Sequence, residues 1–421
     1  MLSLSAALVP VALIERRLDA WLKRLKAHPE PSEAIAVELW NGRRFQVGHH
    51  PRVEIRLRRP SALACLLSPS LDRLGEAYVE GAIDLEGAPL DIMATATRLA
   101  SLAPKPTGRQ RVPTARHSRR QDARDIEYHY DVSNEFYQAW LDREMVYSCA
   151  YFRHPDESLE SAQVNKIDHI LTKLRVAPGD RLLDIGCGWG ALILRAARHF
   201  GAQATGITLS KNQYELARAR IAEAGLEDRC QVHLMDYREV QGSFDRIASV
   251  GMFEHVGLKN LGGYFHAIHR LLAPGGTALN HGITSTDPNS GETPFGGGRF
   301  IDRYVFPNGE LPHISLVHRE MEAAGLEVHD VENLRRHYAL TLRHWSDRFE
   351  SASHALRAMV GERHHRIWRA YLAGCAYGFE QGWMALHQIL ATRADDPRAQ
   401  AHHPLTREYM YASGRPEGQG L

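Results

Sequence analysis

Leu182-Leu183-Asp184-Ile185-Gly186-Cys187-Gly188-Trp189-Gly190 is the stretch that decides the fold of this chain. Apolar residues lead through an acid into three glycines at alternate positions, and residues 191–199 continue with a helical pattern. This order predicts a strand, a tight turn and the start of a helix. Glycines let the backbone approach a ligand closely, and the first N–H groups of a helix have no intrahelical partner. Asp184 is expected at the carboxyl end of the strand, where doubly wound sheets bind ligands.

The spacing of these glycines distinguishes between several kinds of turn. Dinucleotide-binding turns follow G-x-G-x-x-G, whereas this turn follows G-x-G-x-G with an acid two residues before the first glycine. A carboxylate at Asp184 would repel a pyrophosphate but suits a ligand with a cationic end, such as the amino group and sulfonium of S-adenosylmethionine. No G-x-x-x-x-G-K-S/T sequence lies nearby, which argues against a P-loop. S-adenosylmethionine is therefore the favoured ligand, and another nucleotide or a purely structural turn is the alternative.

Strands and helices alternate regularly after residue 180. Strands are predicted at 182–185, 203–208, 230–234, 245–250 and 277–283, with helices at 190–199, 211–224 and 260–272. Alternation at these lengths predicts a parallel sheet with helices on both faces, an α/β Rossmann-like fold. Further helices are expected at 312–325 and 337–395, and residues 285–299, rich in Gly, Ser, Thr and Pro, are expected to form a mobile loop.

The length of 421 residues indicates two domains with additional segments. The predicted parts are a smaller α+β domain at 1–100, a basic proline-containing linker at 101–124, the cofactor-binding domain at 125–395 and a disordered tail at 396–421. Short strands are expected within 35–59, with a hairpin turn at Asn41-Gly42, and mainly helices at 60–100. The N-terminal domain offers a surface for lipid, membrane or dimer contact. The basic linker is either a solvated segment or a site of attraction to anionic lipid headgroups.

Composition limits the classes of function. The chain is 44% apolar and 24% charged, as in ordinary globular proteins, and its net charge of +1 gives no global field for nucleic acid. Its five cysteines are scattered and odd in number, so neither a disulfide framework nor a metal site is indicated, and a reducing cytosol is expected. The apolar run at 2–14 is shorter than the ~20 residues of a membrane span and lacks a basic region before it. Together with residues 15–25 it reads as one amphipathic helix that packs on its own domain or lies on a bilayer surface.

Polar residues follow the ends of the predicted strands. After 203–208 the chain has no acid to bind ribose hydroxyls, so Thr208 and the Gln213 amide would supply those contacts; Ser210 fits as a helix N-cap, which alone would explain it. Asp236-Tyr237 follows the next strand, where a carboxylate can bind an adenine edge. Glu254-His255 follows the fourth strand, where chemistry usually takes place in this architecture. The aromatic residues within 128–152 form either core or a lid whose rings face a sulfonium.

At this point the chain resembles a known family, the cyclopropane-fatty-acyl-phospholipid synthases and the related mycolic acid cyclopropane synthases. The resemblance covers about residues 125–392 and rests on motifs in the right order: 129–134, 147–152, 183–190, 208–213, 249–257, 306–309 with 311–312, and 337–342. Residues 74–81 also look like the N-terminal domain of the bacterial phospholipid enzymes.

The resemblance implies a class I S-adenosylmethionine-dependent methyltransferase fold and an enzyme that cyclopropanates unsaturated phospholipid acyl chains. It implies a cytoplasmic protein peripherally bound to the inner membrane, with a homodimer left open and no nucleic-acid partner. Cofactor contacts by motif match are Tyr147, Ser148, Asp184, Gly186, Gly188, Gly190, Thr208, Leu209, Gln213, Asp236 and Tyr237. A bicarbonate ion, the family's base, would be held by Cys149, Glu254, His281, Ile283 and Tyr338.

Glu254 and Cys375 have different expected roles in the reaction. An ionised Glu254 would repel a neighbouring anion, so we expect Glu254 to share a proton with the ion. Cys375 occupies a position often assigned a catalytic cysteine, but the reaction needs no thiol nucleophile and its apolar helical neighbours favour an inert buried residue.

The chain departs from the family pattern near the acyl site. It reads Asn280-His281-Gly282-Ile283 where relatives place an apolar residue and a threonine around the histidine, and the 285–299 segment differs in length and composition. The product therefore has alternatives: a methyl-branched or methylene chain within the family, or a small molecule methylated on nitrogen or oxygen. A lipid-binding protein with a vestigial cofactor fold is the non-enzymatic alternative, which the intact glycine turn argues against.

Overall fold

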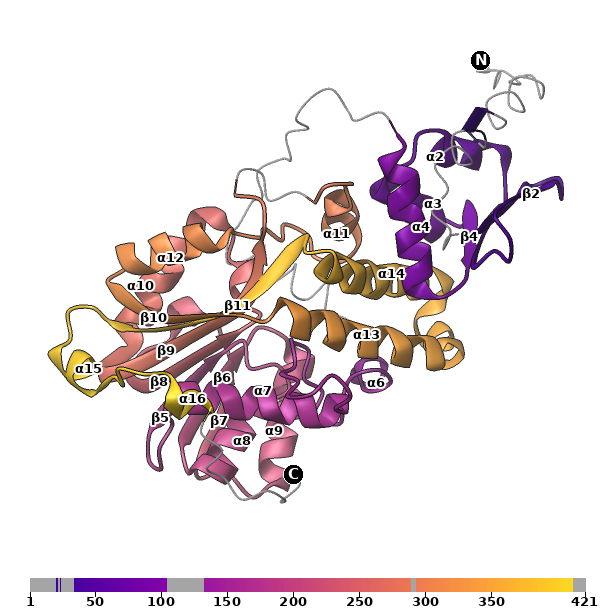
Figure 1. Ribbon diagram of the computed structural model, residues 1–421. Helices are drawn as coiled ribbons and strands as arrows, with labels where there is room; N and C mark the ends of the chain where they lie inside the picture. The colour runs from indigo at the N-terminus through magenta and orange to yellow at the C-terminus, as the bar shows by residue number, and fades with distance from the viewer. Residues whose placement is uncertain (1–19, 22, 24–33, 104–131, 289–292, 412–421) are drawn as a thin grey trace, which may run out of the picture.

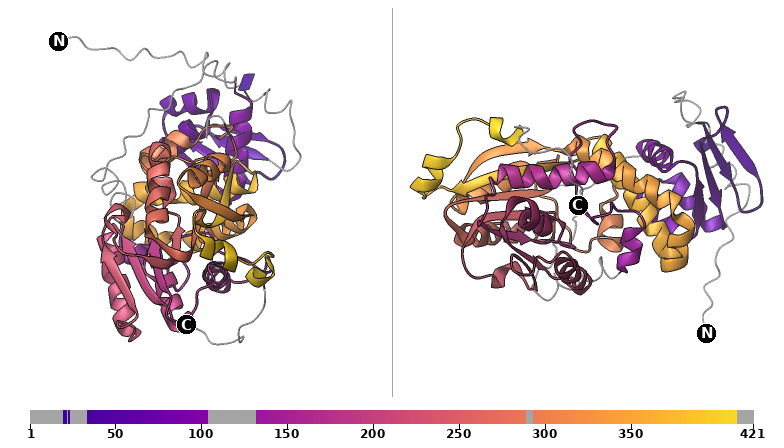
Figure 2. Two further views of the ribbon diagram at one scale, coloured as in Figure 1. Left: turned by 90° about the vertical axis from the view of Figure 1, so that its left-hand side faces the viewer. Right: turned by 90° about the horizontal axis from the view of Figure 1, so that it is seen from below.

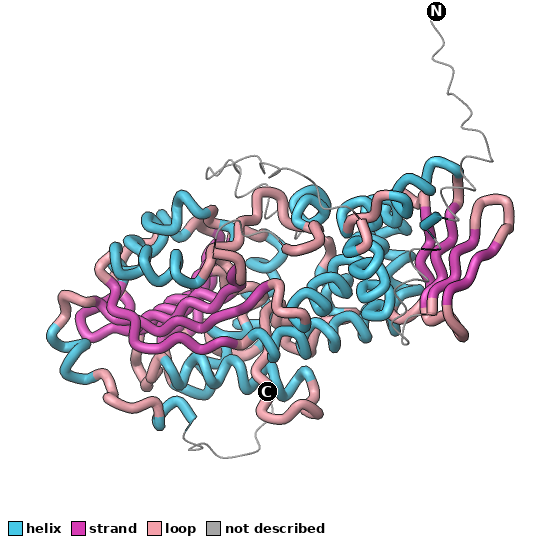
Figure 3. Tube along the Cα trace, turned by 45° about the horizontal axis from the view of Figure 1, so that its top comes forward, coloured by secondary structure: helices cyan, strands magenta, loops and turns pink. Residues whose placement is uncertain are grey.

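The computed structural model describes residues 20–21, 23, 34–103, 132–288 and 293–411 (Figure 1). It contains two sheets that lie at opposite ends of the molecule with helices between them (Figure 3). The large sheet belongs to the cofactor-binding domain, and the small sheet belongs to the N-terminal domain. The apolar segment at 2–14, most of the basic linker and the motif at 129–131 lie outside the described residues.

The large sheet has seven strands in the order β10-β11-β9-β8-β5-β6-β7. Its strands are β5 (Arg181–Ile185), β6 (Gln203–Thr208), β7 (Cys230–Leu234), β8 (Phe244–Val250), β9 (Leu272–Ser285), β10 (Leu326–Asn333) and β11 (Met384–Arg393). The five strands from β7 to β9 are parallel to one another, as the sequence predicts. The two remaining strands are antiparallel: β11 pairs with β9, and β10 pairs with β11 at the sheet edge.

Helices cover both faces of this sheet, and each face has its own apolar core. On one face lie α7 (Leu159–Lys173), α8 (Ala191–Phe200) and α9 (Lys211–Glu223), whose buried residues form one cluster. On the other lie α10 (Leu261–Leu271) and α12 (Ile314–Ala323), which pack in a second cluster. This arrangement confirms the predicted α/β layers and leaves the carboxyl ends of β5, β6 and β8 free to form a site.

The predicted helix over 337–395 is wrong in its last part. The chain forms α13 (Arg335–Ser351) and α14 (Ser353–Glu380), then turns at Gly382, where φ is 72°, and enters β11. β11 is almost entirely buried between two strands, and its sequence mixes apolar residues with His387, Gln388 and Thr392, so it shows no alternation of a half-exposed strand. β10 was not predicted either, because it is an edge strand added from a distant part of the chain.

The small sheet has the order β2-β1-β3-β4, formed by β1 (Ile35–Glu38), β2 (Arg44–Val47), β3 (Val53–Leu57) and β4 (Ile83–Glu86). The predicted hairpin turn is confirmed, with Gly42 at φ 80°. Helices α2 (Leu63–Leu67), α3 (Leu71–Val79) and α4 (Pro89–Ser101) complete the domain, whereas β4 interrupts a region predicted as mainly helical. Both α3 and α4 pack against α14 (Figure 2).

Part of the predicted disordered tail is ordered. Two short helices, α15 (Pro397–His402) and α16 (Glu408–Tyr411), follow β11. Arg407 pairs with Asp330 of β10 at 2.6 Å, and Met410 is buried in the core shared with α7. The prediction missed these contacts because they involve one ion pair and one apolar side chain rather than a periodic pattern. The described helices include none that is long and apolar enough to cross a membrane.

Candidate cofactor and catalytic site

The glycine turn after β5 has the backbone geometry that its sequence predicts. Gly186, Gly188 and Gly190 all have positive φ, at 82°, 54° and 88°. The N–H groups of Gly186 and Cys187 both donate to the carbonyl of Ile207 at 3.0 Å, which fixes the turn to the end of β6. L residues rarely adopt these φ values, so the turn requires glycine.

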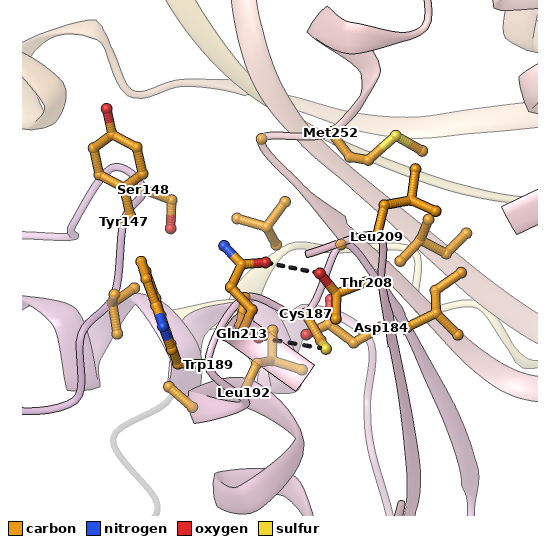
Figure 4. Close-up of a pocket in the computed structure, with 18 of the residues that line it drawn as sticks. Tyr147, Ser148, Asp184, Cys187, Trp189, Leu192, Thr208, Leu209, Gln213 and Met252 are labelled. Atoms are coloured by element: carbon orange, nitrogen blue, oxygen red, sulfur yellow. Dashed lines mark hydrogen bonds between the residues drawn. The ribbon is translucent and has the colours of Figure 1, made fainter. Parts of the chain in front are cut away.

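A pocket opens over this turn (Figure 4). Nine of the eleven predicted cofactor residues line it: Tyr147, Ser148, Asp184, Gly186, Gly188, Thr208, Leu209, Gln213 and Tyr237. They come from the loop before α7, from the ends of β5 and β6, from the start of α9 and from the turn after β7. The fold thus brings segments that are up to 90 residues apart in the chain into one cavity.

Two predicted cofactor residues are not among those that line the pocket. Gly190 is the N-cap of α8, and a Cβ at this position would lie 3.2 Å from the Cβ of Ala217. Asp236 is buried, and its carboxylate accepts hydrogen bonds from the Arg238 guanidinium at 2.6 and 2.8 Å. Gly190 therefore allows the turn to pack closely against α9. The Asp236 carboxylate is hydrogen-bonded to Arg238.

The polar side chains at the end of β6 are oriented by hydrogen bonds. The hydroxyl of Thr208 donates to Gln213 Oε1 at 2.7 Å, which leaves the NH₂ group of the Gln213 amide directed away from Thr208 (Figure 4). Ser210 accepts from the Gln213 N–H at 3.3 Å, which confirms its role as the N-cap of α9. Among the described residues the Gln213 NH₂ group forms no hydrogen bond, so it can donate to a ligand at the pocket wall.

The sequence analysis missed several residues of the pocket, among them Lys166, Trp189, Met252 and His255. Lys166 lies on α7 and is 2% exposed. A signal was present: a lysine stands on the apolar face of an amphipathic helix, between Ala162 and Ile170. A lysine at such a position is rarely buried without a functional or structural partner.

A second cluster lies beside this pocket and contains the predicted anion-binding residues. Glu254 belongs to the 3₁₀ turn Phe253–His255 after β8, and its Oε1 accepts from the N–H of Ile283 in β9 at 2.7 Å. Its other oxygen, Oε2, is buried without a hydrogen-bond partner among the described residues. Burial raises the pKa of Glu254 to about 7, so its carboxyl can hold a proton near neutral pH.

His281 lies two residues before Ile283 in β9 and has a neutral imidazole. Burial, together with Lys166 and Lys173, holds its pKa well below the ordinary value. The Gln388 amide nitrogen lies 3.3 Å from Nδ1, an arrangement in which the amide donates and the ring carries its proton on Nε2. Within the described part of the chain Nε2 has no partner. His281 therefore offers one buried N–H donor.

Tyr338 and Cys149 complete the cluster. Tyr338 on α13 is buried, and its pKa is raised well above its usual value by burial and by nearby Tyr371, Cys149, Cys375 and Glu254. The Cys149 thiol is fully buried and donates to the backbone carbonyls of Ala150 and Leu334. Tyr338 is thus a neutral phenol, and Cys149 is a neutral thiol rather than a thiolate.

The departure around His281 has a structural counterpart. A Cβ at Gly282 would lie 1.7 Å from the ring of Phe253, so glycine is needed for Phe253 to pack against β9. Because Phe253 immediately precedes Glu254, this contact helps to set the position of the Glu254 carboxyl. The unusual glycine and the anion cluster are therefore parts of one packing arrangement.

Comparisons with known proteins identify the family of this chain. The family described as mycolic acid cyclopropane synthetase matches residues 117–389, and a domain of unknown function (DUF7884) matches residues 22–103. A probable fatty acid methyltransferase of Pseudomonas putida is 48% identical over 381 residues, which cover 90% of this chain and 96% of the relative. The cyclopropane-fatty-acyl-phospholipid synthase of Escherichia coli K12 is 34% identical over 369 residues, which cover 85% of this chain and 93% of the relative.

Solved structures give the same result for the fold. The cyclopropane synthase MmaA2 from Mycobacterium tuberculosis matches with a TM-score of 0.61 and 34% identity, over 64% of this chain and 98% of that chain. The mycolic acid cyclopropane synthase CmaA1 complexed with SAH and CTAB matches with a TM-score of 0.61 and 35% identity, over 64% of this chain and 97% of that chain. These matches confirm the predicted class I S-adenosylmethionine-dependent methyltransferase fold.

Proposed function

Because the chain belongs to the mycolic acid cyclopropane synthetase family, we propose that it converts cis double bonds of phospholipid acyl chains into cyclopropane rings. It is an S-adenosylmethionine-dependent methyltransferase of the cyclopropane synthase type. The observation that carries the proposal is a pair of buried polar atoms without partners among the described residues, Glu254 Oε2 and His281 Nε2. They lie next to the cofactor pocket, because His255 lines that pocket and Gly251 bonds to the backbone of His281.

The pocket residues fit the methyl donor. When bound, S-adenosylmethionine supplies an electrophilic methyl group that the π electrons of a cis double bond attack, leaving a carbocation on the acyl chain. The glycine turn lets the ligand come close to the protein backbone, because no Cβ atoms stand in the way. The Gln213 amide offers N–H donors for the ribose hydroxyls. The Asp184 side chain, 2% exposed, lines the pocket where the cationic end would lie; burial raises its pKa to about 7, and a bound cation would favour its carboxylate form. These groups bind and orient the donor without taking part in bond making.

The second cluster fits a small anion. Its members offer one buried N–H at His281, a phenol at Tyr338 and a carboxyl at Glu254 that burial keeps near half-protonated at neutral pH. Bicarbonate, the ion that the family resemblance implies, would accept the proton lost from the added methyl as the ring closes. A buried anion near a developing cation stabilises it. Glu254 in its protonated form donates to the ion and avoids repelling it.

Aromatic side chains surround the place where the cation would form. The Tyr147 hydroxyl, at the pocket, donates to the Tyr371 hydroxyl at 3.1 Å, and the ring of Tyr147 lies 5.3 Å from that of Trp345. Tyr371 also packs edge-on against Phe306. Aromatic faces attract cations and exclude water. A carbocation formed here is shielded from capture by water, which supports ring closure over hydration.

A membrane substrate is part of the proposal. The basic linker at 101–124 and the N-terminal domain suit peripheral association with an anionic bilayer at the cytoplasmic face. If the acceptor were a soluble small molecule, neither the basic linker nor the N-terminal domain would have an evident role.

A methyl-branched product is the second candidate, favoured by one observation. The relative from Pseudomonas putida, 48% identical, is named a probable fatty acid methyltransferase rather than a cyclopropane synthase. Both products share the first bond-forming step and differ in which carbon loses the proton.

Expression of the chain in cells rich in monounsaturated phospholipid tests the proposal. Lipid mass spectrometry is expected to show acyl chains that gain one CH₂ unit and lose the alkene. A methylated headgroup with intact alkenes would contradict it.

A further inference from the structure

A side chain rather than a strand bonds to β9 just beyond the end of β8. The two strands pair in parallel up to Val250 and His281, and β9 then continues to Ser285. The Ile283 N–H in this extension donates to the carboxyl of Glu254 at 2.7 Å. The position of the carboxyl therefore depends on the short turn that connects β8 to Glu254.

Residues 252–255, here called the site turn, send their side chains to three different places. Met252 and His255 line the cofactor pocket, and Glu254 belongs to the anion cluster. Phe253 is 1% exposed and belongs to the apolar core that the sheet forms with α10. The site turn thus reaches both functional sites, while Phe253 attaches it to the core.

The backbone of β9 makes room for the ring of Phe253 at Gly282. Successive strand residues face opposite sides of a sheet, so position 282 faces the α10 side, whereas His281 and Ile283 face the other. Gly282 does not have the positive φ that favours glycine. A Cβ there would lie 1.7, 2.2 and 3.0 Å from three ring carbons of Phe253, against 3.4–4 Å for an ordinary contact. Space rather than backbone conformation therefore requires glycine.

A side chain at position 282 would displace more than the ring. To reach an ordinary contact, the ring would have to move by more than 1 Å within a close-packed core. The adjoining residue, Glu254, would move with it. The Glu310 N–H also donates to the Glu254 carbonyl, but at 3.4 Å, which is long for such a bond and restrains the site turn weakly.

We propose that Phe253 and Gly282 form a positioning pair for the reaction. The ring lies against the bare backbone of Gly282 and holds the site turn where Glu254 Oε1 meets the Ile283 N–H and Oε2 stays available to the anion. This inference rests on the proposed function, in which the Glu254 carboxyl shares a proton with that anion. The pair acts through Glu254 and not on a reacting atom.

Gly282→Ala in the full-length protein tests the pair. It should lower kcat on vesicles of a monounsaturated phospholipid by roughly 100-fold, the loss expected when a reacting group is displaced by about 1 Å. The affinity for S-adenosylhomocysteine, measured by calorimetry, should stay within about 5-fold, because the glycine turn is unchanged. Gly263→Ala in α10, where a Cβ would meet nothing within 4 Å, is the matched control and should change neither value. A folded Gly282→Ala with kcat within about 3-fold of wild type would overturn the inference.

A second substitution separates positioning from a general loss of stability. Leucine lacks the atoms that correspond to Cε1 and Cζ of Phe253, so Phe253→Leu relieves most of the overlap with Ala at position 282. The double variant should recover kcat at least about 10-fold over Gly282→Ala, a non-additive effect. A double variant no more active than Gly282→Ala would overturn the inference. If Gly282→Ala does not fold, Phe253→Leu alone should lower kcat by roughly 3- to 10-fold, and an unchanged kcat would overturn it.

Infrared spectroscopy observes the Glu254 carboxyl without any turnover. Below its pKa of about 7 the group holds a proton, and the difference spectrum between each protein and its Glu254→Gln counterpart isolates its C=O band. Loss of the bond from Ile283 should move this band to higher frequency in Gly282→Ala, and Phe253→Leu should return it. An unmoved band would overturn this inference. A band that moves as expected in a protein that leaves the alkene unchanged would refute the proposed function and keep the positioning pair.

Discussion

Glu254 and Ile283 are joined by a hydrogen bond of 2.7 Å from the Ile283 N–H to Glu254 Oε1. The bond fixes the Glu254 carboxyl to β9 and leaves Oε2 as the free oxygen of a buried acid. His281 lies two residues before Ile283 in the same strand, so its side chain is on the same face of the sheet as that of Ile283. The hydrogen bond from the Ile283 N–H thus places the Glu254 carboxyl beside β9, the strand that contains His281.

Glu254→Gln is expected to reduce turnover at least about 100-fold while leaving the affinity for S-adenosylhomocysteine within about 3-fold. The glutamine carbonyl can still accept from Ile283, so the fold is kept, but the amide cannot exchange a proton with an anion. Turnover on phospholipid vesicles and calorimetry check the two parts. Glu310→Gln is a matched control, because the Glu310 side chain accepts from the Leu258 N–H at 2.9 Å, and its backbone N–H, which donates to the Glu254 carbonyl, is kept in the variant. Near wild-type turnover in Glu254→Gln would refute the anion-site account.

Stability should depend on pH through the same residue. Burial raises the folded-state pKa of Glu254 to about 7, so its protonated form favours folding. That contribution is fully present below the unfolded-state pKa of about 4.3 and is lost as pH rises through about 7. Glu254→Gln does not titrate. Its free energy of unfolding should therefore rise relative to wild type across this window, by an amount on the order of 3 kcal/mol. Urea denaturation at several pH values measures the difference, and parallel profiles would contradict the prediction.

Cys375→Ser should remain active. Burial raises the pKa of the Cys375 thiol to about 12, so no thiolate is available as a nucleophile near neutral pH. We expect turnover within about 5-fold of wild type, the residual change coming from burial of a hydroxyl in apolar surroundings. Circular dichroism verifies folding, and loss of turnover in a folded variant would restore the catalytic role.

Gly75→Ala tests the contact between the two domains. A Cβ at Gly75 in α3 would lie 2.8 Å from the Phe300 ring of α11 (Gly298–Tyr304). The same helices are joined by a hydrogen bond from the Phe300 N–H to Asp72 at 2.9 Å. We expect the variant to lose about 1–3 kcal/mol of stability through overpacking. Gly263→Ala in α10, where a Cβ would meet nothing within 4 Å, is the control and should not destabilise. If Gly75→Ala and the wild type unfolded at the same midpoint, the contact between Gly75 and Phe300 would not contribute to stability.

The sequence predicted the part of the fold whose signals are local. The alternation from 182 to 283 gave the parallel strands, and the glycine turn located the pocket at Asp184. β11 was missed because a strand buried on both faces lacks the alternation of a half-exposed strand, so periodicity does not distinguish it from a helix. Lys166 was not predicted as a pocket residue because α7 lies before the glycine turn in the sequence. The contact of Lys166 with Ser148 becomes visible only in the fold. Asp236 stays a predicted ligand contact; its hydrogen bond from Arg238 is one that no local pattern in the sequence indicates.

The central claim is ring formation on an acyl chain, and a deuterium label tests it most directly. The purified protein is incubated with vesicles of a monounsaturated phospholipid and S-adenosylmethionine carrying a fully deuterated methyl group, and the acyl chains are analysed by mass spectrometry and NMR. We expect a saturated cyclopropane that retains two of the three deuterium atoms, because one deuteron leaves the added methyl group as the ring closes. Retention of all three in a methyl branch, or label in the headgroup beside an intact alkene, would contradict it.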